Sequence, residues 1–397
     1  MTKSLASRIF VTCLISGSVS FCLGYGMSAV QAGDWSLEAK TTSKGDLNDN
    51  YYLKPVSDGF VFGSLSNVNV DLIHKSAIDR FDLIGDLGYQ SYFGAVQSSS
   101  QNKLLPRIAA KYHLSGKTDS IDLGAGYFFS DISAIDPLDP IGLNRNLTRH
   151  TIAANAAYSK TLSPRLSVGS AASFEDVIFS DAGVGVNPYT STNLSSYLKY
   201  RVTKTTDFKT TLGGQWQSIN DLQNSLNSSY YLRGDISSQL EKNLSISFGG
   251  GPRVGINYLD NIFMPSHPRI SSNSLGWVAD ASLNYAFKEG SISASVSHSV
   301  DPDVLGNLQS RNTFSLAASQ AINEESQFDV SAQYRVSTSV AAIDQRTFVF
   351  APVYRYRLAR EWSMAAGYSF TWTDGGAGTG HSDDLFLSLS RSFVLSP

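Results

Sequence analysis

Cysteine is nearly absent from this chain of 397 residues: there are two, Cys13 and Cys22, and both lie among the first 32 residues. Neither marks a convincing lipidation site, because Phe21 stands directly before Cys22. If the first 32 residues are removed, no thiol remains for a disulfide, a metal site or a nucleophile. The mature protein must then be held together by its backbone hydrogen bonds.

Long apolar runs are also missing beyond residue 32, where no uninterrupted stretch approaches the roughly 20 residues that a membrane helix needs. If this part of the chain enters a membrane, it does so as a closed barrel, because only helices and closed barrels pair every backbone group in lipid.

Net charge is small, at −3, and becomes about −5 without Lys3 and Arg8. Such a mild acidic balance does not indicate a nucleic-acid partner.

The first 32 residues have the pattern of an export signal. Lys3 and Arg8 form a positive start, residues 9–23 are mainly apolar, and Val30-Gln31-Ala32 resembles a small-residue cleavage site. A membrane anchor is the alternative, but serine and glycine residues dilute the apolar stretch. We therefore predict two parts: a cleaved signal peptide, 1–32, and an exported mature part, 33–397.

From about residue 60 onward, runs of roughly a dozen residues alternate between apolar and polar types. In one run Phe81, Leu83 and Leu87 share one parity, and Asp82 and Asp86 share the other. Side chains alternate between the two faces of a strand, so this period of two predicts strands with one apolar and one wet face. These runs are about twice the usual strand length of about 5 to 6 residues and suit tilted membrane strands, which need about 9 to 11. The same pattern recurs in 208–217, 328–336 and 362–372.

Connectors between the runs are by turns short and long. Outer-membrane barrels have short periplasmic turns and longer extracellular loops, so we expect the long set to face outward. With a first strand near 34–41, the count is about 18, with 16 possible, and both chain ends lie in the periplasm. The predicted fold is all-β: residues 33–397 form an outer-membrane β-barrel that is transmembrane, antiparallel and up-and-down. The short connectors are 74–79, 115–119, 161–164, 203–206, 241–243, 288–290, 323–325 and 359–361, and the long ones are 42–59, 94–103, 131–147, 176–190, 220–228, 259–273, 301–311, 337–345 and 374–381.

Aromatic residues on the apolar parity gather toward the ends of the predicted strands. Two girdles at the membrane interfaces would have this distribution, although aromatic residues also favour strands in general. Residues of this kind near long loops are Phe93, Tyr127, Phe129, Phe174, Trp216, Trp277, Phe348, Phe370 and Trp372, and those near short turns are Phe81, Tyr112, Tyr158, Tyr200, Tyr285 and Phe287.

Two prolines conflict with this pattern, because Pro352 falls inside the predicted strand 346–358 and Pro252 follows three glycines. A closed barrel has no edge on which a proline can avoid the hydrogen-bond ladder. We therefore expect each proline to mark a bulge or a different register.

Asp49-Asn50-Tyr51, followed by Ser57-Asp58-Gly59-Phe60-Val61-Phe62, resembles the start of β-barrel porins that are often encoded with bacterial exopolysaccharide export systems. In those proteins an Asp-Asn pair likewise precedes the opening strands. The resemblance implies an outer-membrane barrel and a partner role in polysaccharide secretion. It implies no catalytic residue.

No arrangement of residues predicts catalysis, a metal site or a cofactor. The six histidines are scattered, and none has a second histidine at metal-ligand spacing. The acids of 131–139 are candidates for a hard-cation site, as are Asp374, Asp383 and Asp384. We expect both groups to be solvated loop acids instead. The glycine-rich segment 375–380 lacks the strand-to-helix junction of a phosphate site, so we expect a flexible surface loop.

The polar parity carries charges of both signs together with many Ser, Thr, Gly, Asn and Gln residues, which suits a water-filled interior. A barrel of this size leaves an aqueous lumen. The charges also suit pairing across strands that stiffens the wall, and we expect both. Because the signs nearly balance, we predict weak ion selectivity at most. The candidate pore-lining residues are Arg201, Arg233, Arg335, Arg355, Lys199, Asp82, Asp86 and Asp235.

The sequence therefore favours a non-enzymatic outer-membrane channel for small hydrophilic solutes in a Gram-negative bacterium. Its expected partners are outer-membrane lipids, lipopolysaccharide and the barrel-assembly machinery. A second hypothesis is an accessory component of polysaccharide export, with a lumen closed by an inward-folded loop, for which the long segment 131–147 is a candidate, and with periplasmic export partners. A third is a soluble secreted β-protein, such as a sandwich or a solenoid.

Overall fold

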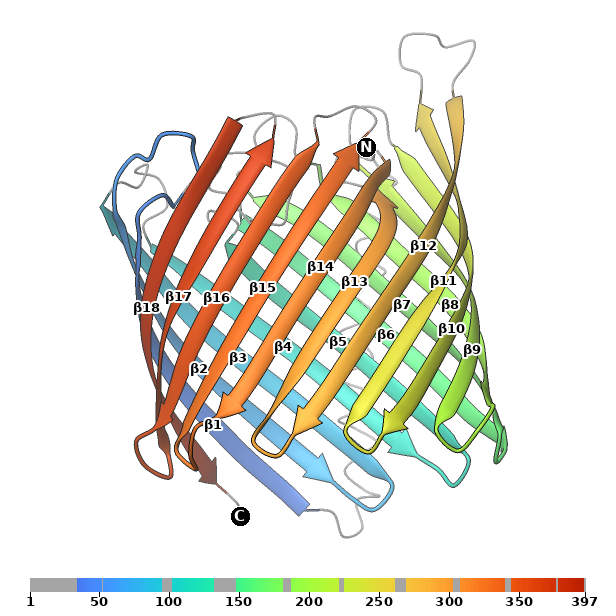
Figure 1. Ribbon diagram of the computed structural model, residues 1–397, viewed down its shortest axis with the longest axis horizontal. Helices are drawn as coiled ribbons and strands as arrows, with labels where there is room; N and C mark the ends of the chain where they lie inside the picture. Colours follow the sequence, from blue (N-terminus) through green and yellow to red (C-terminus); the bar gives the residue numbers. More distant parts are fainter. Residues whose placement is uncertain are drawn as a thin grey trace, which may run out of the picture.

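The structure is a computed structural model that describes residues 34–51, 53–94, 102–131, 148–180, 187–220, 225–260, 269–302, 308–339, 344–375 and 378–395. These residues form one 18-stranded antiparallel sheet, in which each strand pairs with the next and the last pairs with the first (Figure 1). The predicted up-and-down barrel of 18 strands is confirmed, and a single closed sheet excludes the sandwich, the solenoid and a count of 16. The described residues include no helix that is long and apolar enough to cross a membrane.

The strands are long, as the alternating runs predict, with 13 to 19 residues each. Strands of this length tilt across the barrel wall in Figure 1. They are β1 (Asp34–Asn48), β2 (Val61–Lys75), β3 (Asp79–Gly94), β4 (Asn102–Ser115), β5 (Asp119–Asp131), β6 (Thr148–Ser163), β7 (Leu166–Ser180), β8 (Tyr189–Arg201), β9 (Thr206–Ile219), β10 (Leu226–Glu241), β11 (Leu244–Asp260), β12 (Arg269–Phe287), β13 (Gly290–Pro302), β14 (Leu308–Ala321), β15 (Ser326–Ser339), β16 (Gln345–Arg357), β17 (Trp362–Gly375) and β18 (Gly378–Leu395).

Short turns collect at one end of the barrel, the lower end in Figure 1. The first and last strands also have their outer ends there, because Asp34 pairs with Lys75 at the end of β2 and Leu37 pairs with Leu395. The predicted signal peptide, 1–32, lies outside the described residues.

Several predicted boundaries are wrong because strands extend into the predicted long connectors: β7 ends at Ser180, β12 begins at Arg269 and β14 begins at Leu308. β1 continues to Asn48 and does not end at residue 41, because Lys44 and Asp46 face the barrel interior and made a strand look like a polar loop. The predicted long connector 374–381 is also wrong, since β17 ends at Gly375 and β18 begins at Gly378. Glycine is required at Gly380, where a Cβ atom would overlap the carbonyl oxygen of Leu53 in the segment after β1.

The two prolines open the ladder on one side without shifting its register, so the predicted bulges are wrong. On β16, pairing with β17 stops at Phe350 and resumes at Val353 in the same register, while pairing with β15 runs through Pro352. On β11, pairing with β10 is interrupted beside Pro252 in the same way, and pairing with β12 is continuous. Proline lacks only an N–H group, so one local gap accommodates it.

The seam between β1 and β18 is reinforced by the Asp49-Asn50 pair that follows β1. The backbone N–H of Asp49 donates to the carbonyl oxygen of Asp383 at 3.1 Å, and the N–H of Asp383 donates to Oδ1 of Asp49 at 2.7 Å. The buried Asn50 amide donates at 2.7 Å to the carbonyl oxygens of His381 and Lys54, and accepts from the N–H of Lys54. This pair therefore joins the first strand to the last.

We expect Asn50→Ala to lower the free energy of unfolding by about 2 kcal/mol, because the carbonyl oxygens of His381 and Lys54 lose the donor that the buried Asn50 amide supplies. Asp58→Ala is the matched control, since Asp58 makes an ion pair with Lys54 on the surface of the same segment and such pairs contribute about 0 to 1 kcal/mol. Denaturant unfolding in lipid vesicles, followed by tryptophan fluorescence, measures both. Equal midpoints for the two variants would contradict this role of Asn50.

Candidate functional site

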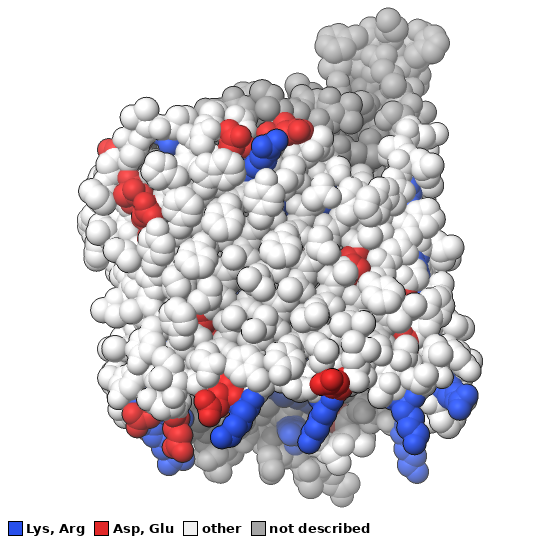
Figure 2. Space-filling model, viewed as in Figure 1, with Lys and Arg blue, Asp and Glu red and all other residues white. Residues whose placement is uncertain are grey.

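The wall of the barrel has an apolar outer face and a polar inner face. Large apolar side chains such as Leu87, Leu212 and Val296 are exposed on the parity that points outward. Figure 2 shows this outer surface, on which most of the charged residues lie near the two ends of the barrel. The aromatic residues predicted for two girdles all have the outward parity by the strand registers.

All eight candidate pore-lining residues have the inward parity. Cross-strand pairing is the basis for this placement: Asp82 lies opposite Lys111, Asp235 opposite Lys209, and Arg335 opposite Thr347. The structure brings four of the eight into two clusters, Lys199 and Arg201 around Asp207, and Arg233 with Asp235. Arg355 pairs with Asp329, Asp82 pairs with Arg80, and Asp86 accepts a hydrogen bond from Asn67.

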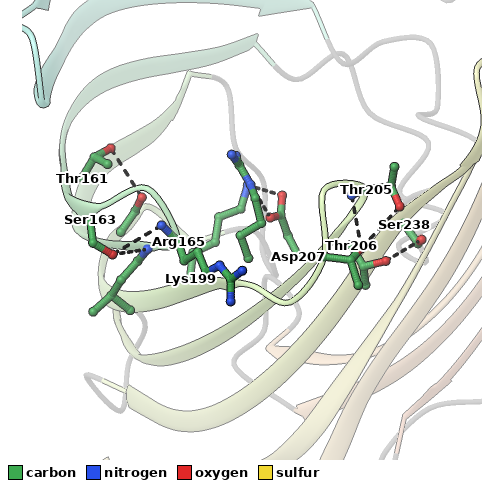
Figure 3. A network of polar contacts seen from close by, with 12 residues as sticks. Thr161, Ser163, Arg165, Lys199, Thr205, Thr206, Asp207 and Ser238 are labelled. Carbon is green, nitrogen blue, oxygen red and sulfur yellow. Dashed lines mark hydrogen bonds and ion pairs between the residues drawn. The ribbon is translucent and has the colours of Figure 1, made fainter.

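The first cluster is centred on Asp207, which the sequence analysis missed. Its carboxylate lies 2.9 Å from Lys199 Nζ and 3.4 Å from Arg201 Nε, near the short turns (Figure 3). Lys199 stands directly opposite Lys209, a like-charged pair that would be unfavourable alone. Asp207 offsets this repulsion, and Lys209 Nζ lies 4.8 Å from the ring centre of Tyr197.

The second cluster explains Gly249 of β11. Arg233 on β10 binds Asp235 on its own strand and Asp280 on β12, so its side chain crosses β11. A Cβ atom at Gly249 would lie 2.8 Å from Arg233 Nη2. The absence of a side chain at Gly249 therefore leaves room for the guanidinium of Arg233 to reach two acids. These acids compensate the positive charge of Arg233.

Two further pairs of inward charges follow the same rule. Arg149 Nη2 lies 2.7 Å from Glu175 Oε1, and Lys44 Nζ lies 3.7 Å from Asp46 Oδ1. The predicted pairing of charges across and along strands is therefore present. Lys44 and Asp46 escaped the sequence analysis because their segment was assigned to a loop, although continued alternation past residue 41 would have revealed them.

Inward aromatic rings lie flat against the wall over glycines of neighbouring strands. Tyr231 lies over Gly213, Tyr197 over Gly169, and a Cβ atom at either glycine would overlap the ring. Phe386 lies in the same way over Gly367. The rings consequently follow the wall and do not project across the lumen.

Inward side chains on β13 to β15 are accessible to solvent. Four side chains that face the barrel interior are exposed: Ser291, Ser295, Ala317 and Ser331. Near the long loops of β8 to β11 the inward wall is instead buried, as at Gln217, which is 6% exposed. The inner wall is thus accessible to water on β13 to β15 and buried near the long loops of β8 to β11.

The segment after β1 contributes to the mouth of the barrel. Tyr51 packs on the inward-facing Tyr92, with ring centres 4.8 Å apart, and both form a buried cluster with Val61. The sequence analysis proposed a different inward-folding loop, 131–147, of which residues 132–147 lie outside the described residues.

The histidines offer no catalytic arrangement within the described residues. His74, His150 and His298 face outward and contact Trp35, Phe129 and Trp277, with ring centres 3.8 to 4.8 Å apart. His113 faces inward, 2.6 Å from Asp122. No three His, Asp or Glu side chains in the described ranges gather as a metal site, and Asp383 and Asp384 have opposite parities.

No protein-family model matches the chain, and no curated protein matches it significantly. Among solved structures, a BenF-like porin from Pseudomonas fluorescens Pf-5 is 10% identical over 92% of this chain and 99% of its own, with a TM-score of 0.48. The outer membrane protein OpdK of Pseudomonas aeruginosa is 10% identical (90% and 99% covered, TM-score 0.46), and OccK2 (OpdF) of the same species is 12% identical (91% and 98%, TM-score 0.49). With TM-scores below 0.5, these similarities carry no inference about the solute, and none of the three names mentions polysaccharide export.

We expect Gly213→Val to lower the single-channel conductance, because the added side chain displaces the ring of Tyr231 from the wall into the lumen. Gly214→Val is the matched control, since its nearest neighbour is the outward ring of Trp216. Conductance in planar bilayers measures the effect. Equal conductance of the two variants would show that the ring stays at the wall.

Replacing Arg233 by Met should make the lumen more selective for cations, because Asp235 and Asp280 then face it without their partner. Reversal potentials across a salt gradient give the selectivity. Arg233→Met combined with Asp280→Asn restores the original net charge of the cluster and should restore the wild-type reversal potential. An unchanged potential in the single variant would mean that permeating ions do not pass this cluster.

Proposed function

We propose that this protein is a non-enzymatic channel for small hydrophilic solutes in the outer membrane of a Gram-negative bacterium. The single observation that carries the proposal is the closed 18-stranded wall, which is apolar outside and has solvent-accessible polar side chains inside. A soluble protein would have the reverse arrangement, because apolar side chains exposed to water are unfavourable.

Membrane insertion is supported by the outward parity as a whole. Exposed Leu, Val, Phe, Tyr and Trp side chains surround the barrel, and a closed wall leaves no unpaired strand edge in lipid. The aromatic residues near both ends would lie at the two interfaces. The bound lipids would then be outer-membrane lipids, with lipopolysaccharide in the outer leaflet, and insertion would require the barrel-assembly machinery.

The proposed orientation has the long loops outside the cell and the short turns in the periplasm. It is supported by the common location of the short turns and of the ends of β1 and β18, an arrangement typical of bacterial outer-membrane barrels.

A passive solute pathway is supported by the width of the barrel and by the condition of its inner wall. Barrels of 16 to 18 strands leave an aqueous channel. Inward cations such as Arg233 and Arg355 are neutralised by neighbouring acids, so weak ion selectivity is expected. The eight candidate pore-lining residues belong to this proposal as wall residues that solutes pass.

The second candidate is a polysaccharide-export component with a plugged lumen and periplasmic export partners. One observation favours a narrowed mouth, namely the inward packing of Tyr51 on Tyr92. That contact occupies one side of the mouth, and the exposed inward serines of β13 favour a pathway that remains open.

We expect the purified barrel to give steady, open-pore currents in planar lipid bilayers, with nearly equal permeability to K⁺ and Cl⁻. Heat-modifiable migration on a gel verifies that the barrel is folded in the same preparation. A correctly folded barrel that passes no current would exclude the channel and favour the accessory role.

A further inference from the structure

One sector of the inner wall is lined by hydroxyl groups. Strand β13 presents serine at five successive inward positions, and Ser315 of β14 lies directly opposite the central one, Ser295. Successive inward side chains on one strand are about 6.7 Å apart. We call this surface the hydroxyl face: Ser291, Ser293, Ser295, Ser297, Ser299 and Ser315.

The hydroxyl face is wet, and its β13 members have no side-chain partner within the described ranges. Ser291 and Ser295 are exposed, and Ser293 and Ser297 are half-buried. Some serines elsewhere on the inner wall are instead paired with each other, as in the 2.7 Å contact between Ser247 and Ser282. The β13 hydroxyl groups therefore keep both their donor and their acceptor capacity for molecules in the lumen.

The acids at the borders of the hydroxyl face are already compensated. Asp280 lies opposite Ser297 and is bound by Arg233. On the other side, Asp329 on β15 is bound by Arg355. A cation that passes the hydroxyl face thus gains little Coulomb attraction from these two acids. The one inward cation of β14, Arg311, lies at the end of the face opposite Ser299 and donates a hydrogen bond to the neutral Gln309 at 3.2 Å.

We infer that the hydroxyl face makes the channel favour neutral, polyhydroxylated solutes, meaning sugars and sugar alcohols. This inference rests on the proposed channel function and adds a solute class to it. Such a solute gives up hydrogen bonds to water when it nears the wall, and serine hydroxyls replace them as donors or acceptors in either direction. Weak contacts repeated along a path speed transport, because each one is favourable enough to enter and weak enough to leave.

A purely steric role is the alternative, since serine is small and widens the lumen. The replacement of serine by alanine separates the two roles, because alanine keeps the space and removes the hydroxyl. The test variant is Ser291→Ala, Ser293→Ala, Ser295→Ala and Ser297→Ala together. Its control replaces four serines of the outward parity: Ser170→Ala, Ser196→Ala, Ser218→Ala and Ser310→Ala.

Proteoliposome swelling measures entry of sorbitol and of tetraethylene glycol, a neutral chain of similar size with two hydroxyls. In the wild type and in the outward control, sorbitol should enter faster than tetraethylene glycol. In the test variant this ratio should fall about twofold or more, as expected when weak hydrogen bonds are lost, while KCl conductance stays unchanged. Ser293→Ala with Ser297→Ala is a milder variant should the fourfold change impair folding.

An unchanged ratio in the folded test variant would overturn the inference and support the steric role. So would a wild type that admits both solutes at equal rates. If the folded wild type admits neither solute and passes no current, the proposed channel function itself fails, and that result is distinct from a loss of preference.

Discussion

Closure of the backbone hydrogen-bond ladder between β1 and β18 is the constraint on which the rest of this structure depends. A strand without a second neighbour would expose a row of N–H and C=O groups, which is costly in lipid. Closure removes that edge and gives every strand two faces with opposite surroundings. The Asp49-Asn50 segment matters because it adds side-chain hydrogen bonds where the ladder has to close.

The interior of the wall is organised around compensation of charge. Arg233 reaches two acids across the glycines of β11, and Asp207 lies between Lys199 and Arg201. Each arrangement stabilises a charged side chain along the wall, so the charges contribute stiffness and wetting more than a strong field. Inward aromatic rings also lie along the wall, since Tyr231 and Tyr197 lie over glycines. The side chains of β13 that remain accessible in the lumen are serines, which are small and neutral.

The outer surface and the mouth have separate tasks in this arrangement. Outward histidines contact aromatic rings, as His298 does with Trp277 at 3.8 Å, and add to the amphipathic belts that suit membrane interfaces. At the mouth, Tyr51 and Tyr92 hold the segment after β1 against the inner wall. The same segment that reinforces the seam thereby narrows one side of the entrance.

Alternation along the chain by itself determined most of the strands and the parity of the side chains within them, because parity depends on residues two apart, and the connectors between the runs gave the approximate number of strands. It therefore predicted the barrel and the inward parity of residues such as Arg233 and Asp82. It failed where polarity imitates a loop, at Lys44 and Asp46, and where proline is tolerated by a gap on one side of a strand. Only the tertiary structure decided which charges meet, because Asp207, Asp280 and their partners lie on different strands and their contact depends on cross-strand register. The apolar pattern and the turn set the register of each hairpin, but the contact of Arg233 with Asp280 also depends on how a side chain crosses the strand between them.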